Sequence, residues 1–386
     1  MKRPGHINHT QLYSVIILLV LTTVILPGVN LRAAADPNKP AAVKDNTAKS
    51  LYSEPLVDPK ALLIREDAIR SQLGLDAAAN AKLDALCYTL DPLLFAMRDV
   101  PAGSTNPMAL QYSAQIQQEL KALPEILTPD QQQRLEELTL QYHGFAVLFW
   151  PRVISQMQLT DKQLYTISKI ISNTKKELEN FNQKNPSQNQ QSSAREYQQL
   201  MKRQEREIFA VMSLEQKIQW EKILGIPFDF SILRPLSFRA PELTDVTAWI
   251  NSGPLTLSSL RGKVVIVHFW TFGCANCINN YPAYKRWYDK YKSSDVVMIG
   301  IHTPETPSET DVNTVTSKAR ENGLKFPIAI DNNKANWNAW SNNVWPSVYL
   351  VDKKGRVRYW WYGELNWQGA AGEPWITERI DQLLKE

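Results

Sequence analysis

A short, strongly apolar segment that runs directly into a Cys-x-x-Cys pair is the feature that most constrains the fold of this chain. The segment spans residues 264–269 (VVIVHF), and Cys274 and Cys277 follow it after the tetrapeptide WTFG. A continuous, β-branched run of this length predicts a strand that is covered on both faces of a sheet. We expect a helix to begin at Cys274, so the first cysteine would lie where a buried strand turns into a helix.

This position favours dithiol redox chemistry. The thiolate is the reactive form of cysteine, and a helix N-terminus favours negative charge, so Cys274 should ionise below the ordinary value of about 8.5. Both sulfurs lie on one turn of the chain, so Cys277 can attack a mixed disulfide on Cys274 and release the product. Cys274 is therefore the predicted nucleophile and Cys277 the resolving cysteine, and the pair forms the predicted redox-active disulfide.

Two other chemistries use similar patterns. A structural zinc ion needs further close ligands, but beyond residue 35 the chain offers only Cys87, His143, His268 and His302, so we predict no metal. Copper(I) held by the two sulfurs and a histidine suits soft ligands better and stays open as an alternative. Thr271 and Cys274 also match the end of a peroxiredoxin motif, but Val267 replaces its proline, which disfavours a peroxidase.

A second apolar run, residues 296–301 (VVMIGI), is separated from the first by a helical crossover. Such a unit is parallel and right-handed. Because parallel strands end at one edge of a sheet, His302 and Glu305 should lie on the same edge as Cys274, although a solvated loop is the plainer interpretation of these two residues. Residues 347–351 and 356–361 then predict a hairpin, and the C-terminal part is therefore of the α/β class.

Several short motifs accompany the cysteine pair in this region. They are Ala240-Pro241-Glu242-Leu243, Leu260-Arg261-Gly262-Lys263, His302-Thr303-Pro304-Glu305, Trp345-Pro346 and Tyr362-Gly363-Glu364. With these motifs, residues 240–386 resemble exported thioredoxin-like proteins of the TlpA and DipZ kind. The resemblance implies a thioredoxin fold and a thiol-disulfide oxidoreductase without a cofactor. It also implies protein disulfide substrates, an upstream electron donor and a reducing direction.

The resemblance also points to individual residues. It implies a cis proline at Pro346, which would guide the substrate chain as an added strand. From the dense set of tryptophans in this region, we assign Trp345 and Trp270 to the rim of the active site and the others to packing. His268 occupies the position where thioredoxins carry a buried acid, and a histidine could relay the proton of the resolving thiol. A core histidine satisfied by one hydrogen bond is the alternative interpretation. Asn280 stands where related reductants often place a glutamate.

The first 35 residues predict export to the periplasm or cell envelope. Lys2 and Arg3 precede an apolar segment, residues 12–26, and three alanines end at Ala35, an order typical of a cleaved signal peptide. If it were not cleaved, this segment would tether the protein to the membrane. Three of the 43 Lys and Arg residues lie in this leader, so the remainder nearly balances the 39 Asp and Glu residues. Such a balance gives no support to nucleic-acid binding.

Residues 36–60 predict a flexible linker, residues 61–225 an all-α helical domain and residues 226–386 the thioredoxin-like domain. Within the helical domain, capping boxes predict helix starts at Thr128, Thr160 and Ser213. The Leu-Thr-x-x-Gln pattern before two of these helices weakly resembles the helical repeat of Spy-like periplasmic chaperones. We expect this domain to bind or orient a partner, and a chaperone or a copper-binding module is the alternative function.

Overall fold

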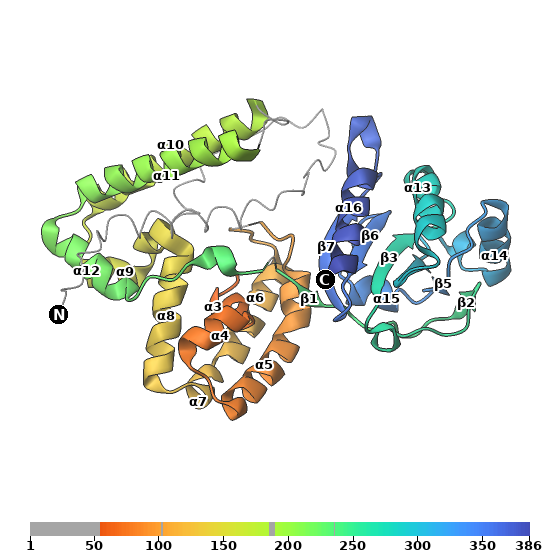
Figure 1. Cartoon of the computed structure of the whole chain (residues 1–386), viewed down its shortest axis with the longest axis horizontal. Helices are drawn as coiled ribbons and strands as arrows, with labels where there is room; N and C mark the ends of the chain where they lie inside the picture. The colour runs from red at the N-terminus through yellow and green to blue at the C-terminus, as the bar shows by residue number, and fades with distance from the viewer. Residues whose placement is uncertain (1–54, 102, 185–189, 235) are drawn as a thin grey trace, which may run out of the picture. The chain divides into compact units, whose positions relative to one another are not determined.

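The computed structural model describes residues 55–101, 103–184, 190–234 and 236–386 (Figure 1). They form two compact units, one helical and one containing the sheet. The helical unit holds the described residues up to Cys87 and those from Val100 to Arg234, whereas the sheet unit holds Tyr88–Asp99 and residues 236–386. The predicted leader and most of the predicted linker lie outside these ranges. Within them, no helix is both long enough and apolar enough to cross a membrane.

In the parts that the structure describes, the regular elements of the helical unit are all helices, as the sequence predicted. They are α3 (Lys60–Leu63), α4 (Asp67–Leu73), α5 (Ala77–Ala96), α6 (Pro107–Leu120), α7 (Leu123–Ile126), α8 (Pro129–His143), η1 (Gly144–Phe149), α9 (Pro151–Met157), α10 (Asp161–Lys184), α11 (Gln190–Val211), α12 (Leu214–Leu224) and η2 (Phe230–Ile232). The predicted capping boxes at Thr128, Thr160 and Ser213 are confirmed. Buried apolar side chains from η1 to α12 form the core of this unit.

The sheet unit is built on a seven-stranded sheet with the strand order β1-β7-β6-β3-β4-β5-β2. Its strands are β1 (Phe238–Arg239), β2 (Ala248–Ile250), β3 (Val264–Trp270), β4 (Val296–His302), β5 (Ile328–Ile330), β6 (Ser347–Val351) and β7 (Arg356–Tyr362). Strands β3, β4 and β5 are parallel, and the other pairings are antiparallel. Every residue of β3 is buried, which confirms the predicted strand covered on both faces.

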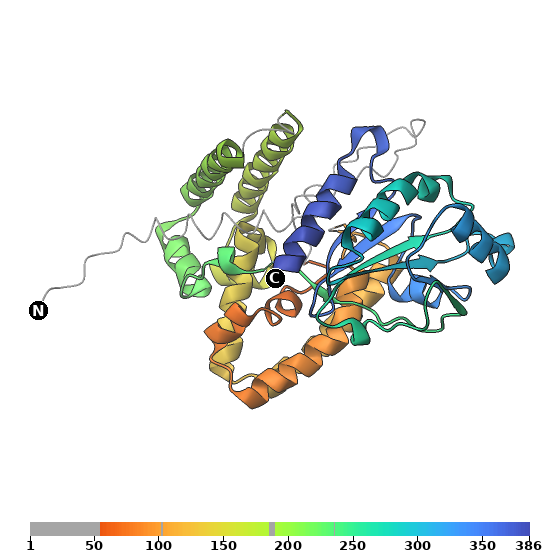
Figure 2. The ribbon, with the colours of Figure 1, turned by 45° about the vertical axis from the view of Figure 1, so that its right-hand side comes forward.

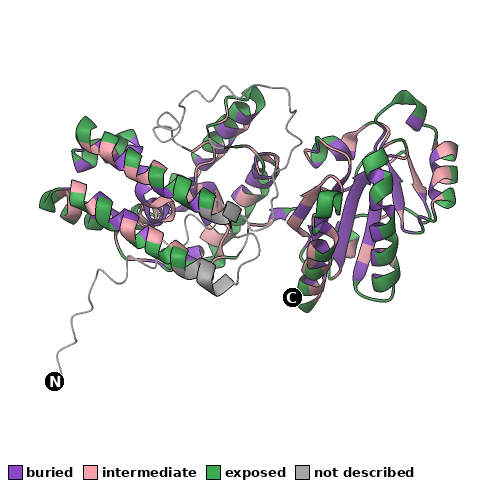
Figure 3. Cartoon of the chain, turned by 90° about the horizontal axis from the view of Figure 1, so that it is seen from above, coloured by how far each residue is buried: buried purple, intermediate pink, exposed green. Residues whose placement is uncertain are grey.

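Helices and aromatic side chains cover both faces of this sheet. The helices are α13 (Ala275–Tyr291), α14 (Val312–Glu321), α15 (Ala335–Ala339) and α16 (Gly372–Lys385), with short turns η3 (Ser258–Leu260), η4 (Pro307–Glu309) and η5 (Trp367–Gly369). Helices α13, α14 and α16 share one apolar cluster with Ile266 and Leu350, and Figure 2 shows α13 beside α16. Phe269 points to the opposite face, where it contacts Trp337 and Trp340. The strands are thus buried between helices whose outer sides are exposed (Figure 3).

The C-terminal part of α5 packs within the sheet unit. Phe95 contacts Phe238 with 5.6 Å between ring centroids. The Arg98 side chain is 3% exposed and donates hydrogen bonds to the Tyr349 hydroxyl (2.9 Å), the Tyr362 hydroxyl (3.1 Å) and the Ser341 carbonyl (3.2 Å). A segment that lies inside the predicted helical domain therefore contributes to the core of the sheet unit.

We expect Arg98→Ala to destabilise the sheet unit by roughly 2–4 kcal/mol, because buried hydroxyl and carbonyl groups would lose a charged donor. The matched control is Arg239→Ala, which removes an exposed guanidinium stacked 4.2 Å from the Tyr88 ring and should cost less than about 1 kcal/mol. Urea unfolding of the full chain, followed by tryptophan fluorescence, measures both. Equal effects of the two substitutions would contradict the anchoring role of Arg98.

Candidate active site

The ends of three neighbouring strands meet at one edge of the sheet. Trp270, the last residue of β3, pairs with His302, the last residue of β4. On the other side of β3, Phe269 pairs with Ser347 at the start of antiparallel β6. The expected placement of the loop after His302 on the same edge as the cysteines is therefore confirmed. Pro346 precedes β6 at this edge, and its peptide bond with Trp345 is cis, as the resemblance implied.

Cys274 is the N-cap residue of α13. Its sulfur accepts a hydrogen bond from the backbone N–H of Cys277 at 3.2 Å, so it takes the place of the hydroxyl or carboxylate that usually caps a helix. Cys274 is half-buried, whereas Cys277 is completely buried, and both are thiols. The expected helix start at the first cysteine is thus confirmed, and only one sulfur is accessible.

The surroundings shift the pKa values of the two thiols in opposite directions. A hydrogen bond from the Cys277 thiol lowers the pKa of Cys274 below its ordinary value, and the backbone N–H of Cys277 adds to this effect against partial burial and the Glu305 carboxylate. Burial raises the pKa of Cys277, and the neighbouring Cys274 sulfur raises it further. Cys274 is therefore the thiol that ionises first, and Cys277 keeps its proton.

A buried polar chain lies next to Cys274. The His302 ring nitrogen Nε2 is 3.2 Å from the Thr271 hydroxyl, and the tautomer of His302 decides which of the two groups donates. The Thr271 hydroxyl also helps to keep the pKa of Glu309 below its ordinary value. Thr271 therefore lies between His302 and Glu309.

Glu309 joins the loop after β4 to the loop that carries the nucleophile. Its Oε1 accepts from the Gly273 N–H at 3.0 Å, and its Oε2 accepts from the N–H groups of Glu305 (2.7 Å) and Thr306 (3.0 Å). A Cβ atom at Gly273 would overlap Oε1, so any other residue here would displace the Glu309 carboxylate from this bond. We did not predict Glu309 from the sequence, although Thr306-x-x-Glu309 is a capping-box pattern that could have indicated it.

Comparison with known proteins agrees with this arrangement. Residues 238–360 match the AhpC/TSA family. The chain is 43% identical over 151 residues to Protein DipZ of Mycobacterium tuberculosis, which covers 38% of this chain and 21% of that protein. It is 29% identical over 147 residues to the thiol-disulfide oxidoreductase YkuV of Bacillus subtilis, and this alignment covers 38% of this chain and 94% of YkuV. It is 33% identical over 103 residues to the thiol-disulfide oxidoreductase ResA of Bacillus thuringiensis, and this alignment covers 27% of this chain and 57% of ResA.

The sheet unit is a thioredoxin-like domain. Its strand order, the Cys-x-x-Cys pair at the start of α13 and the family match all lie in the same region. The chain spans about a fifth of the length of the DipZ protein, and the helices from α3 to α12 lie outside the matched family segment.

His268 lies in the core of the thioredoxin-like domain. It is completely buried, and its ring centroid lies 4.2 Å from that of the tilted Tyr284 ring and 4.8 Å from that of the Phe326 ring, which meets it edge to face. Among the residues that the structure describes, the Ile299 backbone interacts with the ring, although at a geometry too poor for a well-formed hydrogen bond. Burial lowers the pKa of His268 to about 3, so the ring is neutral at physiological pH.

The two tryptophans expected at the rim differ in position. Trp270 is completely buried, so the expectation that it contacts substrate at the rim is wrong: its ring points into the core from the face of β3 that also carries Ile266. Trp345 is half-buried, stacks on Trp337 with 3.8 Å between centroids, and donates its indole N–H to the Thr303 carbonyl at 3.2 Å. Trp345 thus has a fixed orientation beside Pro346.

Asn280 links α13 to the loop after β7. It is buried, its Oδ1 accepts from the Leu365 N–H at 2.9 Å, and its Nδ2 donates to the Gly363 carbonyl (3.2 Å) and the Tyr284 hydroxyl (3.3 Å). These three bonds use the amide group as a structural link. A neutral amide cannot take up a proton at ordinary pH, so the acid that related reductants carry at this position is absent here.

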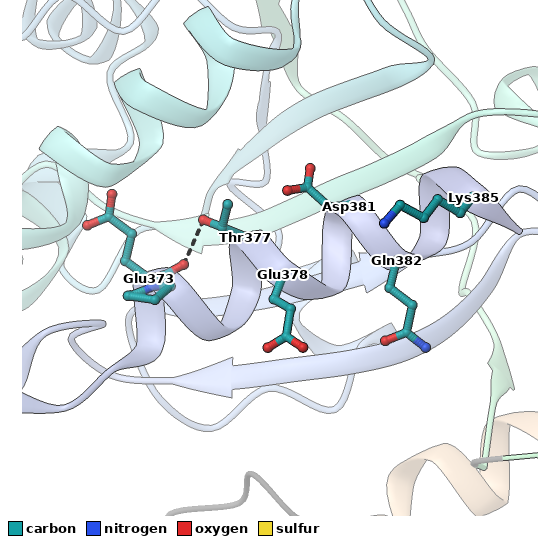
Figure 4. Close-up of a pocket in the computed structure, with 7 residues that line it drawn as sticks. Glu373, Thr377, Glu378, Asp381, Gln382 and Lys385 are labelled. Atoms are coloured by element: carbon teal, nitrogen blue, oxygen red, sulfur yellow. Dashed lines mark hydrogen bonds between the residues drawn. The ribbon is translucent and has the colours of Figure 1, made fainter.

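Two further features do not add to the site. Within the described residues, no three His, Cys, Asp or Glu side chains come together as a metal site would require. A surface pocket along α16, with Glu373, Glu378 and Asp381 in its lining, contains none of the predicted site residues (Figure 4). The Thr377 hydroxyl there bonds to the Glu373 carbonyl of its own helix.

We expect the thioredoxin-like domain to lose stability as the pH falls from 6.5 to 5. Burial lowers the pKa of His302 to about 4 and that of His268 to about 3, so the unfolded chain binds more protons than the folded domain in this window. Each histidine should then lower the free energy of unfolding by about 2 kcal/mol at pH 5 relative to pH 6.5 or above. Free energies of unfolding in urea at pH 7.5 and 5 measure this effect.

The variant His302→Gln separates this effect from general acid sensitivity. Glutamine retains a donor for Thr271 but does not titrate, so the variant should lose less stability between pH 7.5 and 5 than the wild-type protein. An unchanged pH dependence would show that His302 is not protonated on unfolding in this range.

Proposed function

We propose that this chain is an exported thiol-disulfide oxidoreductase that reduces protein disulfides with the Cys274/Cys277 pair. The observation that carries the proposal is the geometry at the start of α13, where one accessible, ionisable sulfur caps the helix and receives the N–H of a second, buried cysteine. The similarity to YkuV and ResA, which are named thiol-disulfide oxidoreductases, supports it.

The apolar leader supports export, and N-terminal sequencing of the secreted or periplasmic protein would test cleavage after Ala35.

The reaction has two exchange steps. In the first, the Cys274 thiolate attacks one sulfur of the substrate disulfide, the substrate S–S bond breaks, and the departing sulfur takes up a proton. In the second, Cys277 loses its proton and attacks Cys274, so an internal disulfide forms and the second substrate thiol leaves. Two electrons pass to the substrate, and an upstream dithiol donor must reduce the Cys274–Cys277 disulfide before the next turnover.

Trp345 and Pro346 are the proposed substrate-binding residues. They precede β6 at the same sheet edge as the cysteines, and the Pro346 carbonyl already accepts the Gly363 N–H at 2.8 Å. The backbone of Trp345 is then the group that could pair with an extended substrate chain as an added strand. The helical unit would bind or orient the partner protein that carries this substrate segment.

We expect Cys274→Ala to reduce disulfide reduction to the uncatalysed level, because the attacking sulfur is lost. Cys277→Ala should instead accumulate mixed disulfides through Cys274, since the resolving sulfur is missing. Insulin reduction and non-reducing gels with mass spectrometry measure these outcomes. Cys87→Ala is the control and should retain full activity, because Cys87 lies on α5 in the helical unit.

Other outcomes would favour the alternative functions. If Cys277→Ala captured no substrate and the wild-type pair did not turn over, the exchange mechanism would be wrong. Tight Cu(I) binding by the wild-type protein would then indicate copper delivery. Suppression of aggregation by the Cys274→Ala/Cys277→Ala protein would indicate a chaperone.

We also propose His268 as the proton relay for Cys277. A completely buried imidazole loses its hydration, and the poorly aligned contact with the Ile299 backbone replaces only part of it, so this histidine is costly for packing alone. The relay would use the neutral ring, because its pKa of about 3 prevents it from storing a proton.

His268→Phe should slow the second exchange step by about 100-fold at pH 7. This loss of rate should shrink as rising pH deprotonates Cys277 directly. Stopped-flow fluorescence resolves this step, and an unchanged rate in a folded variant would make His268 a packing residue.

A further inference from the structure

The loop between β4 and α14 brings two acidic residues to the dithiol from outside α13. Glu305 is exposed and Glu309 is 3% exposed. Through its two carboxylate oxygens, Glu309 bonds at once to the N–H before Cys274, at Gly273, and to the N–H of Glu305. One buried side chain therefore sets the separation between the loop that carries Glu305 and the turn that carries the nucleophile.

The other titratable groups around the sulfurs are uncharged at neutral pH. They are Tyr281 and Tyr284 of α13, whose pKa values burial raises, and His268 of β3 and His302 of β4, whose pKa values burial lowers. Glu309 is ionised, because hydrogen bonds from backbone N–H groups and Thr271 outweigh its burial and keep its pKa below the ordinary value. The charges next to the dithiol are therefore negative, and the Glu305 carboxylate raises the pKa values of both Cys274 and Cys277.

We propose that Glu309 is a positioning residue that holds Glu305 against the dithiol, and that the Glu305 charge makes the pair a stronger reductant. This inference rests on the proposed oxidoreductase function and deepens it by assigning what sets its direction. At the position where α13 could have carried an acid, Asn280 forms structural hydrogen bonds instead. The acidic side chain comes from the neighbouring loop.

The physical reason lies in the reduced state. The disulfide carries no charge, whereas reduction adds two electrons and leaves Cys274 as a thiolate above its pKa. A nearby carboxylate destabilises this thiolate but not the disulfide, so it shifts the equilibrium toward the disulfide and toward electron donation. The effect vanishes at a pH where Cys274 is protonated, because both redox states are then neutral at this site.

The test measures the reduction potential of the Cys274/Cys277 pair in glutathione or dithiothreitol buffers from pH 5 to 9, in the full chain. Glu305→Gln should increase the acidity constant of Cys274 about twofold to fivefold, as expected for a charge at an exposed position. Above the pKa of Cys274, the equilibrium should move toward the dithiol by the same factor, and fivefold corresponds to about 20 mV. Wild-type and variant potentials should converge at low pH.

Two further variants test the positioning role and the specificity of the effect. Glu309→Asp keeps the negative charge but shortens the side chain, so it should break the link between Gly273 and Glu305 and shift the potential in the same direction as Glu305→Gln. In the Glu305→Gln background, Glu309→Asp should add little, because both substitutions act through the Glu305 carboxylate. Glu321→Gln removes the same charge from α14, where Glu321 pairs with Lys318, and should leave the potential unchanged.

The outcomes separate this inference from the proposed function. A pair that titrates normally in the wild-type protein but whose potential and acidity do not respond to Glu305→Gln would overturn the inference and leave the oxidoreductase function intact. A wild-type pair that does not titrate at all would overturn both. Additive effects of Glu305→Gln and the charge-conserving Glu309→Asp would overturn the positioning role alone. Since Glu305 is exposed, its substitution tests the central claim even if Glu309→Asp fails to fold.

Discussion

The parallel pairing of β3 with β4 is the interaction on which the rest of the site depends. The two strands pair along their full length, from Val264 with Val296 to Trp270 with His302. Because parallel strands end together, this register delivers Thr271, Cys274 and the loop after His302 to one edge. A shift of one residue would place every side chain of β3 on the wrong face and separate the cysteine turn from its acidic neighbour.

Burial then decides which groups at this edge carry charge. The interior of the domain keeps two histidines and two tyrosines neutral, because a charge there would lose its hydration without gaining a counter-ion. Glu309 is the exception, since three backbone N–H donors replace the water that it loses. Cys274 gains stability as a thiolate only from the first turn of α13 and from Cys277. The pKa of Cys274 thus depends on a balance between a helix terminus and an acidic loop.

The second face of the sheet is covered partly by residues from α5, far from the sheet in the sequence. Phe269, Trp340 and Tyr349 form an aromatic layer that the strands alone leave uncovered, and Phe95 from α5 packs against it. Arg98, in the turn that follows α5, bonds to Ser341, which lies a few residues before Pro346. A side chain more than two hundred residues earlier in the sequence therefore helps to hold the loop that leads to Pro346.

The sequence by itself determined the local structure and pointed to the two cysteines as the candidate reacting groups. The apolar run at 264–269 specified a strand buried on both faces, the position of Cys274 specified a helix start with an ionisable sulfur, and the capping boxes specified helix starts, because each depends on neighbouring residues only. Tertiary structure decided the burial of Trp270, the neutral state of His268, the role of Glu309 and the contribution of Arg98. Each of these depends on long-range packing, which sets local dielectric and hydrogen-bond partners and leaves no periodic pattern in the sequence.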